Sequence, residues 1–159
     1  MSLIDLSKRV ALGIDIGGTN TKFGVVNHRG EVLEKGSLRT DDYEHVEDFI
    51  DALYEKAYPL IRRFGGEEDF DGIGVGAPDA NYYTGTIDHA PNLPWKGVIH
   101  FSDLRTTKFN IPCTITNDAN AAAYGEMLFG AARGMKDFIM ITLGTGVGSG
   151  IVAGGKLIY

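Results

Sequence analysis

The sequence predicts a mixed α/β domain built around one main sheet. Three short apolar runs, residues 9–16, 21–27 and 31–39, follow one another with only tight turns between them. The apolar period then changes from strand-like to a recurrence every three or four residues over 46–64, which is typical of an amphipathic helix. Strand-like and helix-like segments alternate after that. This order favours a mixed sheet that begins as a three-stranded antiparallel meander, with helices packed on it.

The long helix has signals at both ends. Asp41 followed by Glu44 resembles a capping box at its start, and Gly65-Gly66 supplies a stop. Pro59 lies inside the pattern, so we expect it to kink the helix or to end it early. The acidic residues between positions 44 and 55 are expected to form a solvated face.

The remaining elements are shorter. We expect a buried strand at 71–77, a loop over 78–100 with a small hairpin around Thr84-Gly85, a short helix at 101–109, a strand at 113–117, a helix at 118–129, and a final strand–turn–strand at 137–143 and 147–153. No linker separates these segments clearly.

Composition excludes several classes of protein. Glycine accounts for 22 of the 159 residues, about twice the usual share of ~7 %. Collagen is excluded because there is no G-X-Y period, and disorder because 43 % of the residues are apolar. The single cysteine, Cys113, excludes a disulfide framework. The net charge of −6 argues against a nucleic-acid partner. No signal peptide or membrane span is visible, so we expect a cytoplasmic protein without a membrane partner.

The glycines gather in residues 12–30, 72–76 and 144–155, which together hold 14 of the 22. Glycine inside a strand or helix costs about 0.5–1 kcal/mol relative to alanine, so these clusters indicate positive φ or a close approach of the backbone. Residues 13–19 and 140–146 also echo each other, at an offset of 127 residues. The echo indicates either duplicated lobes or a chance similarity between glycine-rich hairpins.

Two familiar nucleotide-binding motifs fail their structural context. Residues 72–77 and 148–153 match the dinucleotide fingerprint formally, but neither segment opens a helix. Residues 150–156 come close to a P-loop, but Leu157 replaces the serine or threonine that binds magnesium. We therefore reject both motifs.

The first glycine cluster fits a phosphate-binding hairpin. Gly17 and Gly18 stand between two strands, where successive N–H groups can converge on an anion. Asp15 ends an apolar strand, and a carboxylate there makes sense if it faces hydrated Mg²⁺. The alternative is an ordinary tight hairpin with an edge aspartate. The side chains that could add donors or positive charge are Thr19, Asn20 and Lys22.

The third glycine cluster offers the same chemistry a second time. Gly144, Thr145 and Gly146 again form a turn between two predicted strands. Two such hairpins could hold the phosphates of a nucleotide from opposite sides, which one hairpin alone would not suggest.

Asp118 stands where a strand meets a helix. Aspartate is a common N-cap, and that role alone would explain it. Asn117 offers both a donor and an acceptor to a hydroxylated ligand, and small alanines follow. Ligands of α/β sheets bind at the carboxyl ends of strands. A carboxylate there could accept the proton of an attacking hydroxyl during phosphoryl transfer.

Five motifs in order carry a resemblance to a known family: residues 15–24, 74–78, 91–95, 117–123 and 143–148. Together they resemble the ROK family of bacterial sugar kinases, most closely its glucokinases. The resemblance implies a ribonuclease H-like, actin-like ATPase fold in which two related lobes close over a hexose and ATP. The two glycine hairpins would then be one phosphate segment per lobe.

The resemblance also implies roles for individual residues. Asp118 would be the general base on the 6-hydroxyl of the sugar, and Asn117 would bind sugar hydroxyls. Asp15 would lie on the magnesium side, through water. The first phosphate segment would hold Gly17, Gly18, Thr19, Asn20 and Lys22, the second Gly144, Thr145 and Gly146, and Ala77 and Asn92 would border the sugar pocket. Asp79 stands where the family often has glycine, so we expect a different turn there.

Family members continue beyond the point that matches Tyr159, with a Glu-x-x-His motif, a structural zinc site and an adenosine-binding segment. The resemblance therefore implies that residues 1–136 are an N-terminal lobe and 137–159 the first hairpin of a truncated second lobe. We expect such a chain to fold but to be inactive alone, and the full-length form to be a homo-oligomer.

The alternatives are a sugar-responsive repressor of the same family and an actin- or chaperone-type ATPase without a sugar substrate. Such repressors carry a DNA-binding segment before the first strand, whereas eight residues precede Arg9 here. Trp95 could be either a platform facing the sugar or an anchor for its loop.

Overall fold

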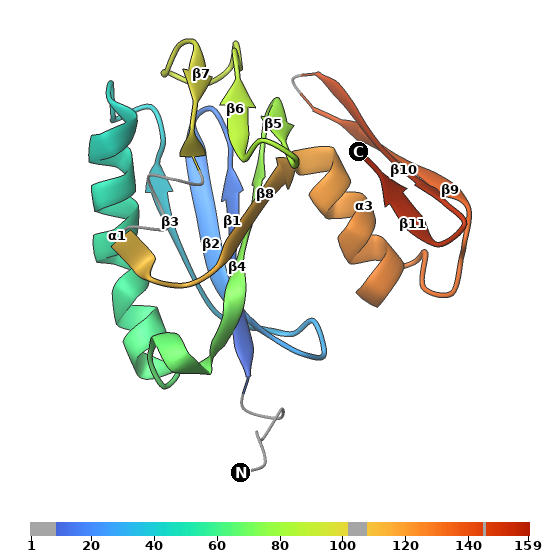
Figure 1. Ribbon diagram of the computed structural model, residues 1–159, viewed down its shortest axis with the longest axis horizontal. Helices are drawn as coiled ribbons and strands as arrows, with labels where there is room; N and C mark the ends of the chain where they lie inside the picture. The colour runs from blue at the N-terminus through green and yellow to red at the C-terminus, as the bar shows by residue number, and fades with distance from the viewer. Residues whose placement is uncertain (1–8, 102–107, 145) are drawn as a thin grey trace.

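The computed structural model describes residues 9–101, 108–144 and 146–159. Its main sheet has five strands in the order β3-β2-β1-β4-β8 (Figure 1). The first three strands are antiparallel, while β4 and β8 run parallel to β1. The predicted meander and mixed sheet are confirmed. The strands are β1 (Val10–Ile16), β2 (Asn20–Asn27), β3 (Val32–Arg39), β4 (Phe70–Ala77) and β8 (Cys113–Asn117).

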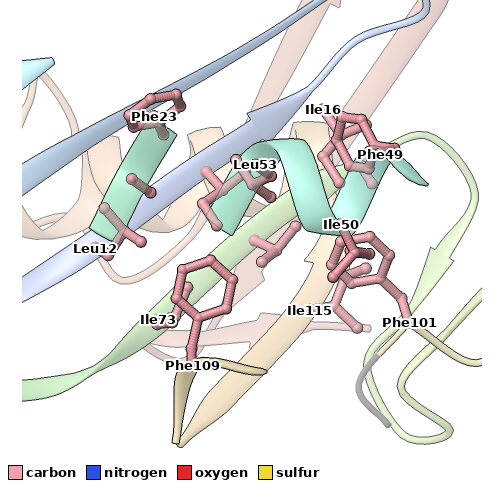
Figure 2. Close-up of a cluster of buried hydrophobic side chains, with 14 of the residues drawn as sticks. Leu12, Ile16, Phe23, Phe49, Ile50, Leu53, Ile73, Phe101, Phe109 and Ile115 are labelled. Atoms are coloured by element: carbon pink, nitrogen blue, oxygen red, sulfur yellow. The ribbon is translucent and has the colours of Figure 1, made fainter. Parts of the chain in front are cut away.

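One face of this sheet carries the hydrophobic core. Helix α1 (Val46–Arg63) covers it, because its buried side chains recur every three or four residues. Phe49 and Leu53 of the helix are fully buried, as are Leu12 and Ile115 of the sheet, to within 1 %. Figure 2 shows these side chains meeting between the helix and the strands, with Phe101 and Phe109 closing the cluster from the chain that leads into β8.

One detail of α1 differs from the prediction, and another excludes one of the two outcomes expected at Pro59. The helix begins after His45, which caps it without a side-chain hydrogen bond. Asp41 instead accepts hydrogen bonds from Arg39, so the predicted capping box is wrong. The helix also continues through Pro59 to Arg63, so proline does not end it. The predicted stop is confirmed, because Gly65 and Gly66 have positive φ and the Gly66 amide donates to the Ile61 carbonyl.

The opposite face of the sheet is lined by glycine. In-register pairing places Gly13 of β1 beside Gly24 of β2 and Gly74 of β4. Gly72 and Gly76 continue this row along β4, because residues two apart share a face of a strand. Most glycines of the first two clusters therefore lie on the face of the sheet away from α1, where no side chains rise above the backbone at their positions.

Helix α3 (Asp118–Phe129) lies on this glycine face, between the main sheet and a second, three-stranded sheet (Figure 1). The second sheet is antiparallel in the order β11-β10-β9. Its strands are β9 (Phe138–Leu143), β10 (Val147–Ala153) and β11 (Lys156–Ile158). One face of β9 and β10 packs toward α3. The other face exposes apolar side chains, including Ile139, Ile141, Leu143, Val147, Ile151 and Ile158.

Smaller elements complete the fold. The expected hairpin around Gly85 is present as β5 (Ala80–Asn81) and β6 (Thr86–Asp88), which β7 (Val98–Ile99) extends to a third small sheet. A short 3-10 turn, η2 (Glu67–Asp69), leads into β4. The helix expected at 101–109 lies mostly outside the described residues. Within the described part of the chain, no helix is long and apolar enough to cross a membrane.

Candidate functional site

A polar row crosses the glycine face near the carboxyl end of β1. Asp15 pairs in register with Lys22 on one side and with Gly76 on the other. Gly76 in turn pairs with Thr116. Residues in register point to the same face of a sheet. The Lys22 ammonium, the Asp15 carboxylate, the bare backbone of Gly76 and the Thr116 hydroxyl therefore lie side by side across the four strands.

The start of α3 fills the gap that Gly76 leaves. A Cβ on Gly76 would lie 3.3 Å from the Ala121 Cβ and 3.5 Å from the Asp118 Cα. The missing side chain therefore lets the first turn of α3 rest directly on β4. This contact brings the exposed Asp118 carboxylate over the polar row.

A cavity of about 800 Å³ opens beside this row, and Asp15, Lys22 and Asp118 all line it. Its floor is the glycine face, and its walls include Tyr124 of α3. A second cavity of about 470 Å³ adjoins it. Tyr82 and Tyr159 line both cavities and stack with ring centroids 4.1 Å apart, so the stacked pair forms a shared wall.

The surroundings of Asp15 raise the pKa of its carboxyl above the ordinary value of 3.8. The largest cause is the loss of water around the group, and the second is the negative charge of Asp118. The Lys22 ammonium opposes both effects by lowering the pKa. The two carboxylates therefore act on each other at one site, which is a setting that favours a bound cation.

The two glycine hairpins have the same loop length. β1 and β2 are joined by residues 17–19, and β9 and β10 by residues 144–146, again at the offset of 127. In each loop the first glycine amide donates within the hairpin, Gly17 to the Asn20 carbonyl and Gly144 to the Gly146 carbonyl, both at 3.0 Å. These two amides are therefore committed to the turns rather than open to an anion.

Gly18 packs against the loop that carries Asn92. A Cβ on Gly18 would lie 2.4 Å from the Asn92 carbonyl oxygen, so only glycine fits there. Trp95 of the same loop is 4 % exposed, its indole N–H donates to the Tyr43 carbonyl at 3.1 Å, and its ring contacts Phe49. Of the two roles left open for Trp95, the structure therefore favours the loop anchor.

The other predicted site residues are placed as follows. Asn117 is the N-cap of α3, and its Oδ1 accepts a hydrogen bond from the Ala119 amide at 3.0 Å. The Ala77 side chain is fully buried in the core, which leaves only its backbone to border a ligand. Thr19, Asn20 and Asn92 are exposed. Thr145 lies outside the described residues.

Thr116 is a site residue that the sequence analysis missed. Its hydroxyl oxygen is buried at the edge of both cavities, and among the described residues it is the buried side-chain oxygen that has no hydrogen-bond partner. The signal was in the sequence, because Thr116 follows the buried Ile115 in a strand that alternates between faces, which turns Thr116 away from the core.

The sequence profile of the ROK family matches residues 11–159. The chain belongs to the ROK family. Its fold is accordingly the ribonuclease H-like fold of the actin-like ATPases, as in the solved ROK sugar kinases. The internal echo of two glycine hairpins is consistent with that architecture.

Similar ROK proteins include enzymes and regulators. The glucokinase of Halalkalibacterium halodurans is 36 % identical over 97 % of this chain and 47 % of its own length. A ROK glucokinase from Streptomyces griseus, solved with glucose and AMPPNP, is 36 % identical with a TM-score of 0.80, over 94 % of this chain and 46 % of that one. A xylose repressor of Caldicellulosiruptor bescii is 31 % identical over 98 % of this chain and 40 % of its own length. The chain thus spans about half the length of these relatives.

Proposed function

We propose that this chain forms the N-terminal part of an ATP-dependent hexose kinase, with glucose as the substrate. The observation that carries the proposal is the Asp118 carboxylate, which is exposed to the cavity and coupled in charge to Asp15. A sugar-binding regulator needs no such base. The similarity to a glucokinase solved with glucose and AMPPNP supports the same substrates.

Asp118 is the general base of the proposed reaction. Its carboxylate accepts the proton of the 6-hydroxyl as that oxygen forms a bond to the γ-phosphorus of ATP, while the bond to the bridging oxygen breaks and ADP leaves. Asn117 fixes the base, because its side chain caps the helix that begins at Asp118. The Nδ2 group of Asn117 remains as a donor toward a sugar hydroxyl.

The residues present fit magnesium and a triphosphate. Asp15 offers a carboxylate for a hydrated Mg²⁺, and the unpartnered Thr116 hydroxyl lies on the same row. Lys22 supplies positive charge beside it. Gly144 and Gly146 have open space where a side chain would be, so a phosphate can approach this hairpin closely. The Gly144 amide itself donates within the turn. Bound Mg²⁺ would neutralise charge on the phosphates during transfer.

The proposal is tested with a fusion of residues 1–159 to the C-terminal half of the Halalkalibacterium halodurans glucokinase. We expect ADP release that depends on glucose, measured in a coupled assay against a panel of hexoses. Asp118→Asn should lower kcat about 10²- to 10⁴-fold, the usual contribution of a general base. The KM for glucose should change little, because the amide keeps the hydrogen-bonding shape of the carboxylate.

Two results would contradict the proposal. One is a folded fusion that releases no ADP with any hexose, and the other is an Asp118→Asn fusion with nearly unchanged turnover. Residues 1–159 without the fusion partner serve as the second control. We expect this shorter chain to fold but to turn over far more slowly, because it cannot enclose the substrates and exclude water.

A further inference from the structure

Helix α3 meets β10 at a contact that leaves no room for a side chain. A Cβ on Gly150 would lie 2.4 Å from the Ala123 Cβ and 2.6 Å from the Ala119 carbonyl oxygen. Real Cβ atoms essentially never come within 3.0 Å of another heavy atom, so any larger residue at 150 must push the strand and the helix apart. Ala119 and Ala123 are themselves fully buried.

Gly148 repeats this contact one step nearer the hairpin tip. A Cβ there would lie 3.1 Å from the Ala119 Cβ and 2.5 Å from the Thr142 Oγ1. We call Gly148, Gly150, Ala119 and Ala123 the small-residue seam. Neither glycine of the seam has positive φ or lines a cavity, so their missing side chains serve the packing against α3.

The other side of α3 is also closely packed. Gly76 of β4 lies so near the helix that a Cβ on it would be 3.3 Å from the Ala121 Cβ. The helix therefore has little room to retreat toward the main sheet. Widening the seam must instead move the second sheet away from α3, and the Gly144–Gly146 hairpin moves with it.

The seam lies within a few residues of both the proposed general base and the second proposed phosphate-binding hairpin. Ala119 directly follows the proposed base Asp118, and Gly148 stands two residues after Gly146. We propose that Gly150 is a positioning residue, whose missing side chain sets how closely the second glycine hairpin approaches Asp118. The effect of Gly150 on catalysis rests on the proposed function. Its effect on the distance between the hairpin and Asp118 can be measured without a ligand.

The first test uses residues 1–159 and needs no ligand. Residual dipolar couplings measured by NMR report the orientation of β9–β11 relative to the main sheet. Gly150→Ala should reorient the second sheet. The matched control is Gly125→Ala on α3, where a Cβ meets nothing within 4 Å. This control should keep the wild-type orientation and raise the stability, because alanine favours the helix.

A milder variant keeps the test decisive if Gly150→Ala does not fold. In Gly148→Ala the Thr142 hydroxyl can rotate away, and only the Ala119 contact at 3.1 Å must give by a few tenths of an ångström. A smaller reorientation in the same direction is expected. Unchanged couplings in the folded variants, or equal changes in the Gly125→Ala control, would overturn the inference.

The second test measures catalysis in the fusion enzyme. Gly150→Ala should lower kcat/KM for ATP about 10- to 100-fold, as expected when reacting groups are misplaced by up to about 1 Å. The KM for glucose should stay within twofold, because widening the seam moves the second sheet and leaves α3, with Asn117 and Asp118 at its start, on the main sheet. Equal losses for ATP and glucose would indicate general damage and overturn the positioning role. An inactive wild-type fusion would instead contradict the proposed function, and the dipolar couplings would still decide the geometry.

Discussion

Asp15 is a carboxylate whose surroundings disfavour its charged form. It stands at the end of a buried strand with Lys22 on one neighbouring strand and the Asp118 charge above it. Burial and the second carboxylate both favour its protonated form. A cation bound beside Asp15 would compensate both effects.

We therefore expect Asp118→Asn to lower the pKa of Asp15, because the substitution removes a negative charge. Lys22→Met should raise it. Carboxyl ¹³C shifts followed through a pH titration of residues 1–159 would measure both. Asp71→Asn is the control, because it removes a carboxylate that pairs with Arg9 away from the site, and it should leave the pKa of Asp15 unchanged. If the pKa of Asp15 were the same in the wild type and in Asp118→Asn, the two carboxylates could not lie as close together as the structure places them.

The same shift affects stability. The folded-state pKa of Asp15 lies above the value of 3.8 expected for the unfolded chain, so the folded state binds more protons between these two values. The contribution of Asp15 is therefore most favourable at low pH and is lost as pH rises through the folded-state pKa. Asp15→Asn should remove this part of the pH dependence of the free energy of unfolding.

At the start of α3, two side-chain oxygens accept a hydrogen bond from the same backbone amide. The Ala119 amide donates to the Asn117 Oδ1 at 3.0 Å and to the Asp118 Oδ1 at 2.7 Å. Asn117 was predicted as a ligand-binding residue and Asp118 as a cap or a base. The structure shows that both side chains satisfy the helix N-terminus, so either one can substitute for the other in that role.

This sharing predicts non-additive stability. Asn117→Ala and Asp118→Ala should each cost less than the usual ~1 kcal/mol of an N-cap, because the other acceptor remains. The double variant should cost more than the sum of the two. Urea denaturation of the four proteins forms a double-mutant cycle that measures the difference. Strict additivity would show that the two acceptors act separately.

Most elements could be predicted because their patterns are local. The strands around 10–39 and the helices at 46 and 118 follow from apolar periods that a single segment contains. The capping box at Asp41 failed because Arg39, two residues earlier in the chain, competes for the same carboxylate. Of the two outcomes expected at Pro59, the early end does not occur, because burial of the apolar face of α1 outweighs one missing hydrogen bond.

The site could be predicted only in part. Asp15 and Asp118 were found because each stands alone at the end of an apolar strand. They come together because β1, β4 and β8 are neighbours in the sheet, and this strand order cannot be read from the local sequence pattern. A close approach of the backbone was predicted for the glycine clusters, but the partners of Gly18 and Gly150 could not be, because they lie far along the chain or on another element.

At the scale of the whole molecule, α3 covers one face of the second sheet and leaves the apolar side chains of the other face exposed. On the side away from α3, Ile139 is 64 % exposed, Ile141 61 % and Leu143 82 %. Soluble proteins seldom leave neighbouring large apolar side chains in water unless another surface covers them. In residues 1–159 alone, this face should drive self-association.

Ile141→Lys should reduce that association, because a charge in the centre of the face opposes its burial. Sedimentation velocity at several concentrations would show a mass that rises with concentration for the wild type and stays constant for the variant. Leu33→Lys is the matched control, since Leu33 is 44 % exposed on β3 of the main sheet. Equal behaviour of the two variants would locate the association elsewhere.

The anchoring of Trp95 gives the molecule an intrinsic optical probe. It is the single tryptophan of the sequence, held between Tyr43 and Phe49 at the base of the loop that presses Asn92 against Gly18. Its emission therefore comes from one place, three residues from a predicted sugar contact. Any hexose that shifts this loop will change the fluorescence of the unlabelled protein, so sugar affinity can be titrated directly, without turnover and without a reporter group.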